Sequence, residues 1–206
     1  TVGVRYRLLA PVRAFAAGLL ALDADCADVR ERLVARVCAW AGQVATSLEG
    51  ADPATVVEEL EHNAPNTRVA HERAAAQPGA AARLLAAFGP WAFSLTVALP
   101  EAVTWARAAL DDPAAEERDR MVLLIQVARL SYVGTEERRA FLHSAIALAE
   151  GFDDPNALAA AWAELALVET DVAETSLKAA MSAQQLAEDA HQPVALGRAI
   201  TFGATA

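Results

Sequence analysis

Apolar residues recur at helical spacing along most of this chain. Between Asp25 and Gly50 they fall at steps of 4, 4, 3, 4 and 4, which predicts one long helix with a single buried stripe. The stripe consists of Val29, Leu33, Val37, Trp40, Val44 and Leu48. Only the first residues of the chain show a different pattern. From Val4 to Leu9 apolar and basic residues alternate, which predicts a short strand with one buried face.

Proline and glycine predict where the helices begin and end. Asp52-Pro53 combines a cap with a first-turn proline, and Gln77-Pro78-Gly79 is a clear breaker. Asn63-Ala64-Pro65 predicts a turn-like interruption, and Gly89-Pro90 a split in the following helix. Together with the later boundaries, these signals predict about ten helices, most of them roughly 15–20 residues long. The later boundaries are Leu99-Pro100, Asp112-Pro113, Gly134-Thr135, Asp154-Pro155, Thr170-Asp171 and Gln192-Pro193.

The predicted strand has no partner, because no second strand is predicted after Leu9. A lone strand is not stable by itself. Pro11 then stands where a helix would begin, since its missing N–H costs nothing there. We therefore interpret residues 1–22 as the last piece of a preceding domain, and residues 23–206 as a helical domain that continues beyond the C-terminus.

The second half of the chain contains an internal repeat. Shifting the sequence by 38 gives ten identities in the 23 positions from Ser144 to Ala166. Leu148 then aligns with Leu186, and Pro155 with Pro193, while an earlier, weaker unit ends in Asp111-Asp112-Pro113 at an offset of 42. A helix pair repeated at this length predicts an all-α, TPR-like antiparallel helical-repeat superhelix, although the strict tetratricopeptide consensus is not met.

Three short stretches carry a family resemblance. The segment Arg5-Tyr6-Arg7-Leu8-Leu9-Ala10-Pro11-Val12-Arg13-Ala14-Phe15-Ala16 resembles the "R-Y-R-L-L-E-x-V-R-x-Y-A" segment of bacterial STAND-type transcriptional regulators, departing from it at Ala10, Pro11 and Phe15. Val29 to Trp40 resembles the family's "R-R-R-H-A-x-Y-Y-L-x-L-A" helix without its histidine, and Pro65 to Ala70 resembles its "D-N-L-R-A-A-L". The family includes SARP-like and LuxR-type regulators with an NB-ARC-like ATPase core.

The resemblance implies that residues 1–22 close a winged-helix domain and that residues 23–206 form its TPR-like repeat region. Such a region would act as a sensor or autoinhibitory arm that contacts a protein partner, its own ATPase core, or a small-molecule or peptide inducer. ATP hydrolysis and DNA binding would belong to other domains. The alternative is a TPR-like protein–protein scaffold with no nucleotide switch, and an all-α enzyme is a third, more distant reading.

The charge of the chain limits the classes of partner that it is expected to bind. The net charge is −10, but residues 1–22 carry +3 with no acid, so the remaining 184 residues carry −13. Because affinity for nucleic acid depends on neutralising phosphates, we expect no direct nucleic-acid contact.

The longest charge-free stretch, Leu84 to Pro100, is 17 residues long and is broken by Gly89-Pro90. It is too short for a membrane span, which needs roughly 20 residues. Cys26 and Cys38 cannot form a disulfide framework. We expect a reduced, buried Cys38 thiol in a cytoplasmic chain that does not contact membranes.

No catalytic, cofactor or metal motif stands out. The sequence has no Gly-rich phosphate loop and no H-E-x-x-H, so we predict no enzymatic activity and no cofactor in this chain. Glu61-His62 and His71-Glu72 are interpreted as surface or helix-end residues rather than metal ligands. The acidic cluster of Asp52, Glu58, Glu59 and Glu61 is interpreted as a solvated helix face.

Five aromatic residues are the candidate binding residues. On the inner helices of a superhelix they could line a concave groove for a ligand or peptide, although at helical spacing they also suit core packing. They are Trp91, Phe93, Trp105, Tyr132 and Trp162.

Overall fold

The computed structural model describes residues 9–22, 26–47, 53–90, 100–130, 135–169 and 173–189. Across these residues the regular structure is helical throughout, which confirms the all-α class. The predicted strand lies outside the described residues, apart from Leu9. The helices are α1 (Ala10–Leu22), α2 (Cys26–Ser47), α3 (Pro53–Ala74), α4 (Ala80–Ala86), α6 (Ala102–Leu110), α7 (Glu117–Leu130), α8 (Thr135–Gly151), α9 (Pro155–Val168) and α10 (Ala173–Asp189).

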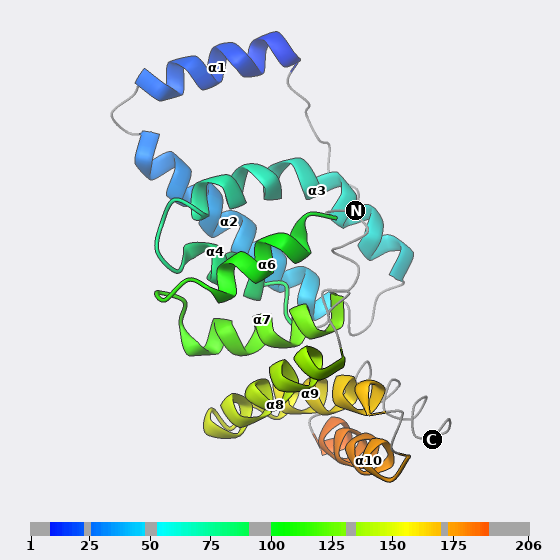
Figure 1. Ribbon diagram of the computed structural model, residues 1–206. Coiled ribbons are helices and arrows are strands. Elements are labelled where there is room, and N and C mark those ends of the chain that lie inside the picture. The colour runs from blue at the N-terminus through cyan, green and yellow to red at the C-terminus, as the bar shows by residue number, and fades with distance from the viewer. Residues whose placement is uncertain are drawn as a thin grey trace.

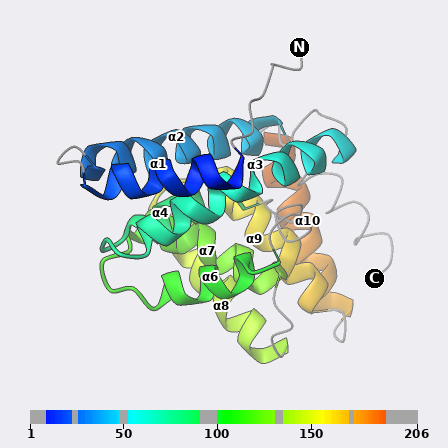
Figure 2. The ribbon, with the colours of Figure 1, turned by 90° about the horizontal axis from the view of Figure 1, so that it is seen from above.

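The helices follow one another as layers along the molecule. Figure 1 shows α1 at one end, then α2 and α3, then α4, α6 and α7, with α8, α9 and α10 at the opposite end. Seen from above, α1 lies over the layer of α2 and α3 (Figure 2). Each layer packs mainly on its neighbours in sequence, which keeps most contacts local.

Most of the predicted helix boundaries agree with the structure. α3 begins at Pro53, α8 at Thr135 and α9 at Pro155. At the start of α9, the Asp154 side chain accepts a hydrogen bond of 3.0 Å from the Ala157 backbone N–H. This is the bond expected of an N-cap aspartate, and the proline after it has no N–H to leave unsatisfied.

The predicted interruption at Asn63-Ala64-Pro65 is wrong, because α3 runs unbroken from Pro53 to Ala74 with Pro65 inside it. Pro65 is exposed, so its ring does not have to enter the packed face of the helix. Side chains also bond to carbonyls of the same turns: Asn63 Nδ2 donates to the Glu59 carbonyl at 2.9 Å, and Thr67 Oγ1 to the Asn63 carbonyl at 3.1 Å. Burial of the rest of α3 offsets the one bond that the proline removes.

Gly79 and Gly89, at two of the predicted helix breaks, both adopt a left-handed backbone conformation. Gly79, just before α4, has φ 71°, and Gly89, just after it, has φ 72°. At Gly79 an added Cβ would lie 2.5 Å from the Ala114 carbonyl oxygen, so this position needs glycine for both conformation and space. α4 stops at Ala86, before Gly89-Pro90, and residues 91–99, where the helix beyond the predicted split would lie, are outside the described residues.

The 38-residue repeat is present in the helix bounds. α7 begins at Glu117 and α9 begins 38 residues later at Pro155, and over the described residues α8 (Thr135–Gly151) and α10 (Ala173–Asp189) occupy positions that also differ by 38. We call α7 with α8 the first unit, and α9 with α10 the second unit. Five of the ten identities pair α8 with α10, and the other five pair α9 with residues 193–204, which lie outside the described residues. The repeat also relates α7 to α9, whose sequences share only Ala128 with Ala166.

Burial follows the same register. Ala145, Ala149, Ala183 and Ala187 are all 0% exposed, so each buried alanine of α8 has a buried counterpart 38 residues later. Leu148 and Leu186 are both partly buried and pack against the same apolar cluster, which confirms their equivalence but at less than full burial. Pro155 opens α9 as predicted, and Pro193 lies outside the described residues.

The offset of 42 found near Pro113 has a local cause. Pro155 is the first residue of α9, whereas Pro113 lies four residues before α7 begins at Glu117. These four residues account for the difference between 42 and 38. Asp112 does not cap α7. Its carboxylate accepts hydrogen bonds from the backbone N–H groups of Gly79 at 2.7 Å and Ala114 at 2.9 Å, which joins this loop to the start of α4.

Candidate functional site

The candidate aromatic residues do not form one described site. Trp91, Phe93 and Tyr132 lie outside the described residues. Trp105 of α6 packs against apolar clusters that include residues of α2, α3, α4 and α7, whereas Trp162 of α9 packs against the clusters formed with α8 and α10. These two candidate tryptophans thus lie in different layers of the helical stack, and both are partly buried in apolar packing.

Trp105 has one unusual neighbour. The imidazole of His71, on α3, stacks against the Trp105 ring with centroids 4.0 Å apart and planes 10° apart. Burial in this stack lowers the pKa of His71, while the charge of Glu72 partly opposes that shift. The stack joins α3 to α6 close to the ion pair between Arg68 of α3 and Glu101, the residue that precedes α6.

The acidic and histidine residues that the structure describes do not converge, and Asp52 of the predicted acidic cluster lies outside the described residues. Glu58, Glu61 and His62 are exposed on α3. Glu59 is half-buried and accepts a hydrogen bond of 2.8 Å from Trp40 Nε1, which makes it part of the α2–α3 packing. Among the described residues no group of three histidine, cysteine or acidic side chains could hold a metal ion.

Cys38 is a free, partly buried thiol on α2. Desolvation raises its pKa, with smaller opposing and supporting effects from Arg83 and Asp119. A thiol with a raised pKa holds little of the reactive thiolate at neutral pH, which agrees with a structural role.

One apolar surface is left open on α1. Leu9 is 73% exposed, Phe15 69%, Leu19 54% and Val12 47%. Val12, Phe15 and Leu19 share one helix face with Ala16, also exposed, and this face has no charged residue. Apolar residues at i, i+3, i+4 and i+7 are typical of a helix that packs against another helix or in a groove.

A repeated polar contact closes the ends of three helices. In each of α7, α8 and α10 the fourth residue donates a side-chain hydrogen bond to a carbonyl ten residues earlier, at the end of the preceding helix. The bonds are Arg120 to Leu110 at 2.7 Å, Arg138 to Ala128 at 2.8 Å and Ser176 to Ala166 at 2.8 Å. Carbonyls in the last turn of a helix lack helical partners, so each bond satisfies a group that would otherwise need water.

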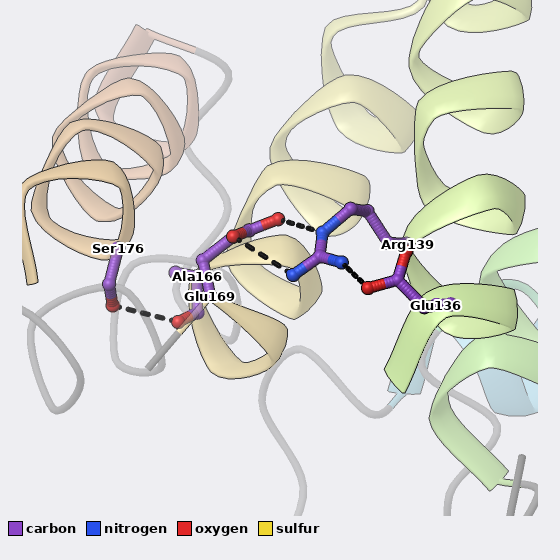
Figure 3. A network of polar contacts seen from close by, with 5 residues as sticks. All are labelled: Glu136, Arg139, Ala166, Glu169 and Ser176. Atoms are coloured by element: carbon purple, nitrogen blue, oxygen red, sulfur yellow. Dashed lines mark hydrogen bonds and ion pairs between the residues drawn. The ribbon is translucent and has the colours of Figure 1, made fainter. Parts of the chain in front are cut away.

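Two arginine–glutamate pairs join the first unit to the second. Arg139 of α8 binds Glu169 with two nitrogens, Nε to Oε1 and Nη2 to Oε2, and also contacts Glu136 (Figure 3). Arg129 of α7 lies with Nε 3.6 Å from Glu164 Oε1. The glutamate side chains are 8% and 1% exposed, and those of the two arginines 29% and 10%, so both pairs are largely withdrawn from water.

Sequence reasoning missed these residues. Glu164 and Glu169 lie within an alanine-rich helix and its cap, where helical spacing alone predicts nothing about partners. A signal was available in the repeat itself. Glu164 aligns with Gln126, which is also buried and donates hydrogen bonds to the carbonyls of Leu85 at 3.1 Å and Gly89 at 2.8 Å. A polar residue at the same buried register in both units indicates a position that contacts the preceding layer.

Within the described residues no helix is both long enough and apolar enough to cross a membrane. No protein-family model matches the chain, no curated protein matches it, and no solved structure matches it.

Proposed function

We propose that this chain is the helical-repeat sensor and interaction segment of an ATPase-type bacterial transcriptional regulator. It binds a partner protein, its own ATPase core or an inducer, and it regulates the core through that contact. The observation that carries the proposal is the pair of repeated helical units in one register, α7–α8 and α9–α10. Repeats of this kind build extended binding scaffolds whose units contact only their neighbours.

The open face of α1 supports an attachment to a preceding domain. The resemblance assigns residues 1–22 to the end of a winged-helix domain, and in such a domain this helix would pack against the helices before it. Val12, Phe15 and Leu19 would then be covered by that domain. The TPR-like superhelix belongs to the same proposal, since the described units supply two helix pairs of it.

The mechanism would be a shift between a closed and an open state of the regulator. A ligand changes such an equilibrium only by as much as its affinity differs between the two states. The arm would provide that difference by binding its partner in one state only. ATP hydrolysis and DNA contact remain with the other domains, and the segment works in the cytoplasm without contacting membranes.

Deletion of residues 23–206 from the full-length protein tests the proposal. ATPase turnover or promoter output should change, because the core would lose its regulatory contact. Phe15→Asp should change the same output by charging the face that packs against the preceding domain, whereas Met181→Asp, at a similarly exposed apolar position on α10, should leave it unchanged.

The second candidate function is a protein–protein scaffold without a nucleotide switch. The repeated helix pairs favour it equally, because they imply binding but no chemistry. A phosphate-binding loop in the sequence upstream of Thr1 would favour the regulator. If the deletion variant shows unchanged ATPase turnover and promoter output, with and without the inducing signal, the scaffold function is favoured over the regulator.

A further inference from the structure

The contacts within a repeat unit differ in kind from the contacts between the two units. Inside the first unit, the Arg138 side chain bonds to the Ala128 carbonyl. Inside the second unit, Ser176 bonds to the Ala166 carbonyl. These bonds end on backbone, whose position is fixed by the helix. Each unit is therefore closed by an internal contact that does not involve its neighbour.

Two ion pairs connect the units, with the positive charges on the first unit and the negative charges on the second. The first unit supplies Arg129 and Arg139, and the second supplies Glu164 and Glu169 from the end of α9. Arg139 holds Glu169 through both carboxylate oxygens, as Figure 3 shows. A forked arginine–carboxylate contact fixes orientation as well as distance.

The apolar part of the same interface has two different surfaces. The first unit contributes large side chains to the shared core, whereas the second contributes mainly alanine. The buried members from the first unit are Met121, Leu124, Ile125, Leu142 and Ile146, with Ala128, Ala145 and Ala149. Those from α9 are Ala157, Ala159, Ala160, Ala161, Ala163, Leu165 and Val168, and Ala183 and Ala187 come from α10, which packs on α9. Alanine buries less side-chain area than a large apolar residue, so each alanine of the second unit adds less apolar area to this contact.

We propose that the second unit opens from the first as one body, and that the two ion pairs are the lock on this joint. The alanine surface makes α9 and α10 separable from α7 and α8, and the arginine–glutamate pairs hold the closed arrangement. Because both glutamates are withdrawn from water, loss of an arginine partner leaves a poorly solvated carboxylate and favours the open form. The joint is a property of the isolated chain and does not depend on the proposed regulatory role. If that role holds, the joint supplies its two states.

Amide hydrogen exchange of the full chain tests the lock, because it reports the opening of each helix separately. Glu169→Gln keeps the shape of the side chain but removes its charge. Amides of α9 and α10 should then exchange at least tenfold faster, while those of α7 and α8 keep their rates. Arg139→Lys keeps the charge but loses the forked contact, and it should give a smaller increase in the same two helices.

The exposed pair Arg107 and Glu137 provides the matched control, with 45% and 48% exposed side chains and a distance of 2.9 Å. Glu137→Gln should leave the exchange of α9 and α10 unchanged. A double-mutant cycle with Arg139→Gln and Glu169→Gln should show that the two changes together cost no more than either alone. Equal acceleration in all helices, additive effects in the cycle, or no acceleration in α9 and α10 would each overturn the proposal.

Discussion

Gly79 shows how much a single residue determines at the junction of two layers. Its backbone has φ 71°, its N–H donates to Asp112 Oδ2, and the Ala114 carbonyl occupies the place where a Cβ would be. The sequence predicted a breaker here but not this contact, because Asp112 lies 33 residues away. Such a long-range bond leaves no periodic signal in the chain.

Gly79→Ala should therefore destabilise the fold by about 1–3 kcal/mol, through strained backbone and a steric clash. Urea denaturation of both proteins measures the difference. Gly42→Ala is the control, because nothing lies within 4 Å of an added Cβ and the residue is helical. That variant should be neutral or more stable by up to ~1 kcal/mol. Equal effects at the two positions would contradict the assignment.

His71 makes the stability depend on pH. Burial against Trp105 lowers its pKa, so the folded state binds a proton less readily than the unfolded state. The free energy of unfolding should then fall as the pH drops below about 6.5, the ordinary value for histidine. His71→Phe keeps an aromatic ring on Trp105 and should flatten the dependence between pH 7 and pH 5 in denaturation experiments. An unchanged slope in that variant would assign the dependence to other groups.

At the scale of the helix, the sequence predicted where a helix lies better than it predicted which of its residues are buried. Helical spacing located α2 from Cys26 to Ser47, and Val37 and Val44 of the predicted stripe are buried, but the buried face also includes residues outside that stripe. Val34 and Ala41 are buried, whereas Val29 is 37% exposed. Alanine packs against neighbouring helices, but a stripe predicted from large apolar residues does not include it. In a chain this rich in alanine, the buried face is therefore wider than its leucines and valines indicate.

The same limit applies to the repeat. The 38-residue shift predicted that Leu148 and Leu186 are equivalent, and the structure confirms it at partial burial. Leu142 of the same helix is 0% exposed. Leu142→Ala should cost about 2–5 kcal/mol, and Leu148→Ala should cost less, because its site is open to solvent on one side. Chemical denaturation of the two variants gives the order, and a larger loss at Leu148 would show that the register has been misread.

At the scale of the whole molecule, the candidate site was the least predictable part. The aromatic groove was inferred from residue type, yet Trp105 and Trp162 pack in separate layers of the helical stack. The arginine–glutamate pairs between the units depend on which helices become neighbours, and residues 30 or more apart set that arrangement. The all-α class and the helix pairs follow from local patterns, whereas their contacts follow from assembly.

Charge at this scale predicts how the isolated chain meets nucleic acid. The 184 residues after residue 22 carry −13, against +3 from Arg5, Arg7 and Arg13. Binding to duplex DNA requires several phosphates to be neutralised, and each such contact makes the affinity fall with salt. We expect no change in the fluorescence anisotropy of a labelled duplex at low salt, with or without Arg→Ala changes at the three positions. Salt-dependent binding that these changes abolish would show that the basic opening contacts DNA, and it would move DNA recognition into this chain.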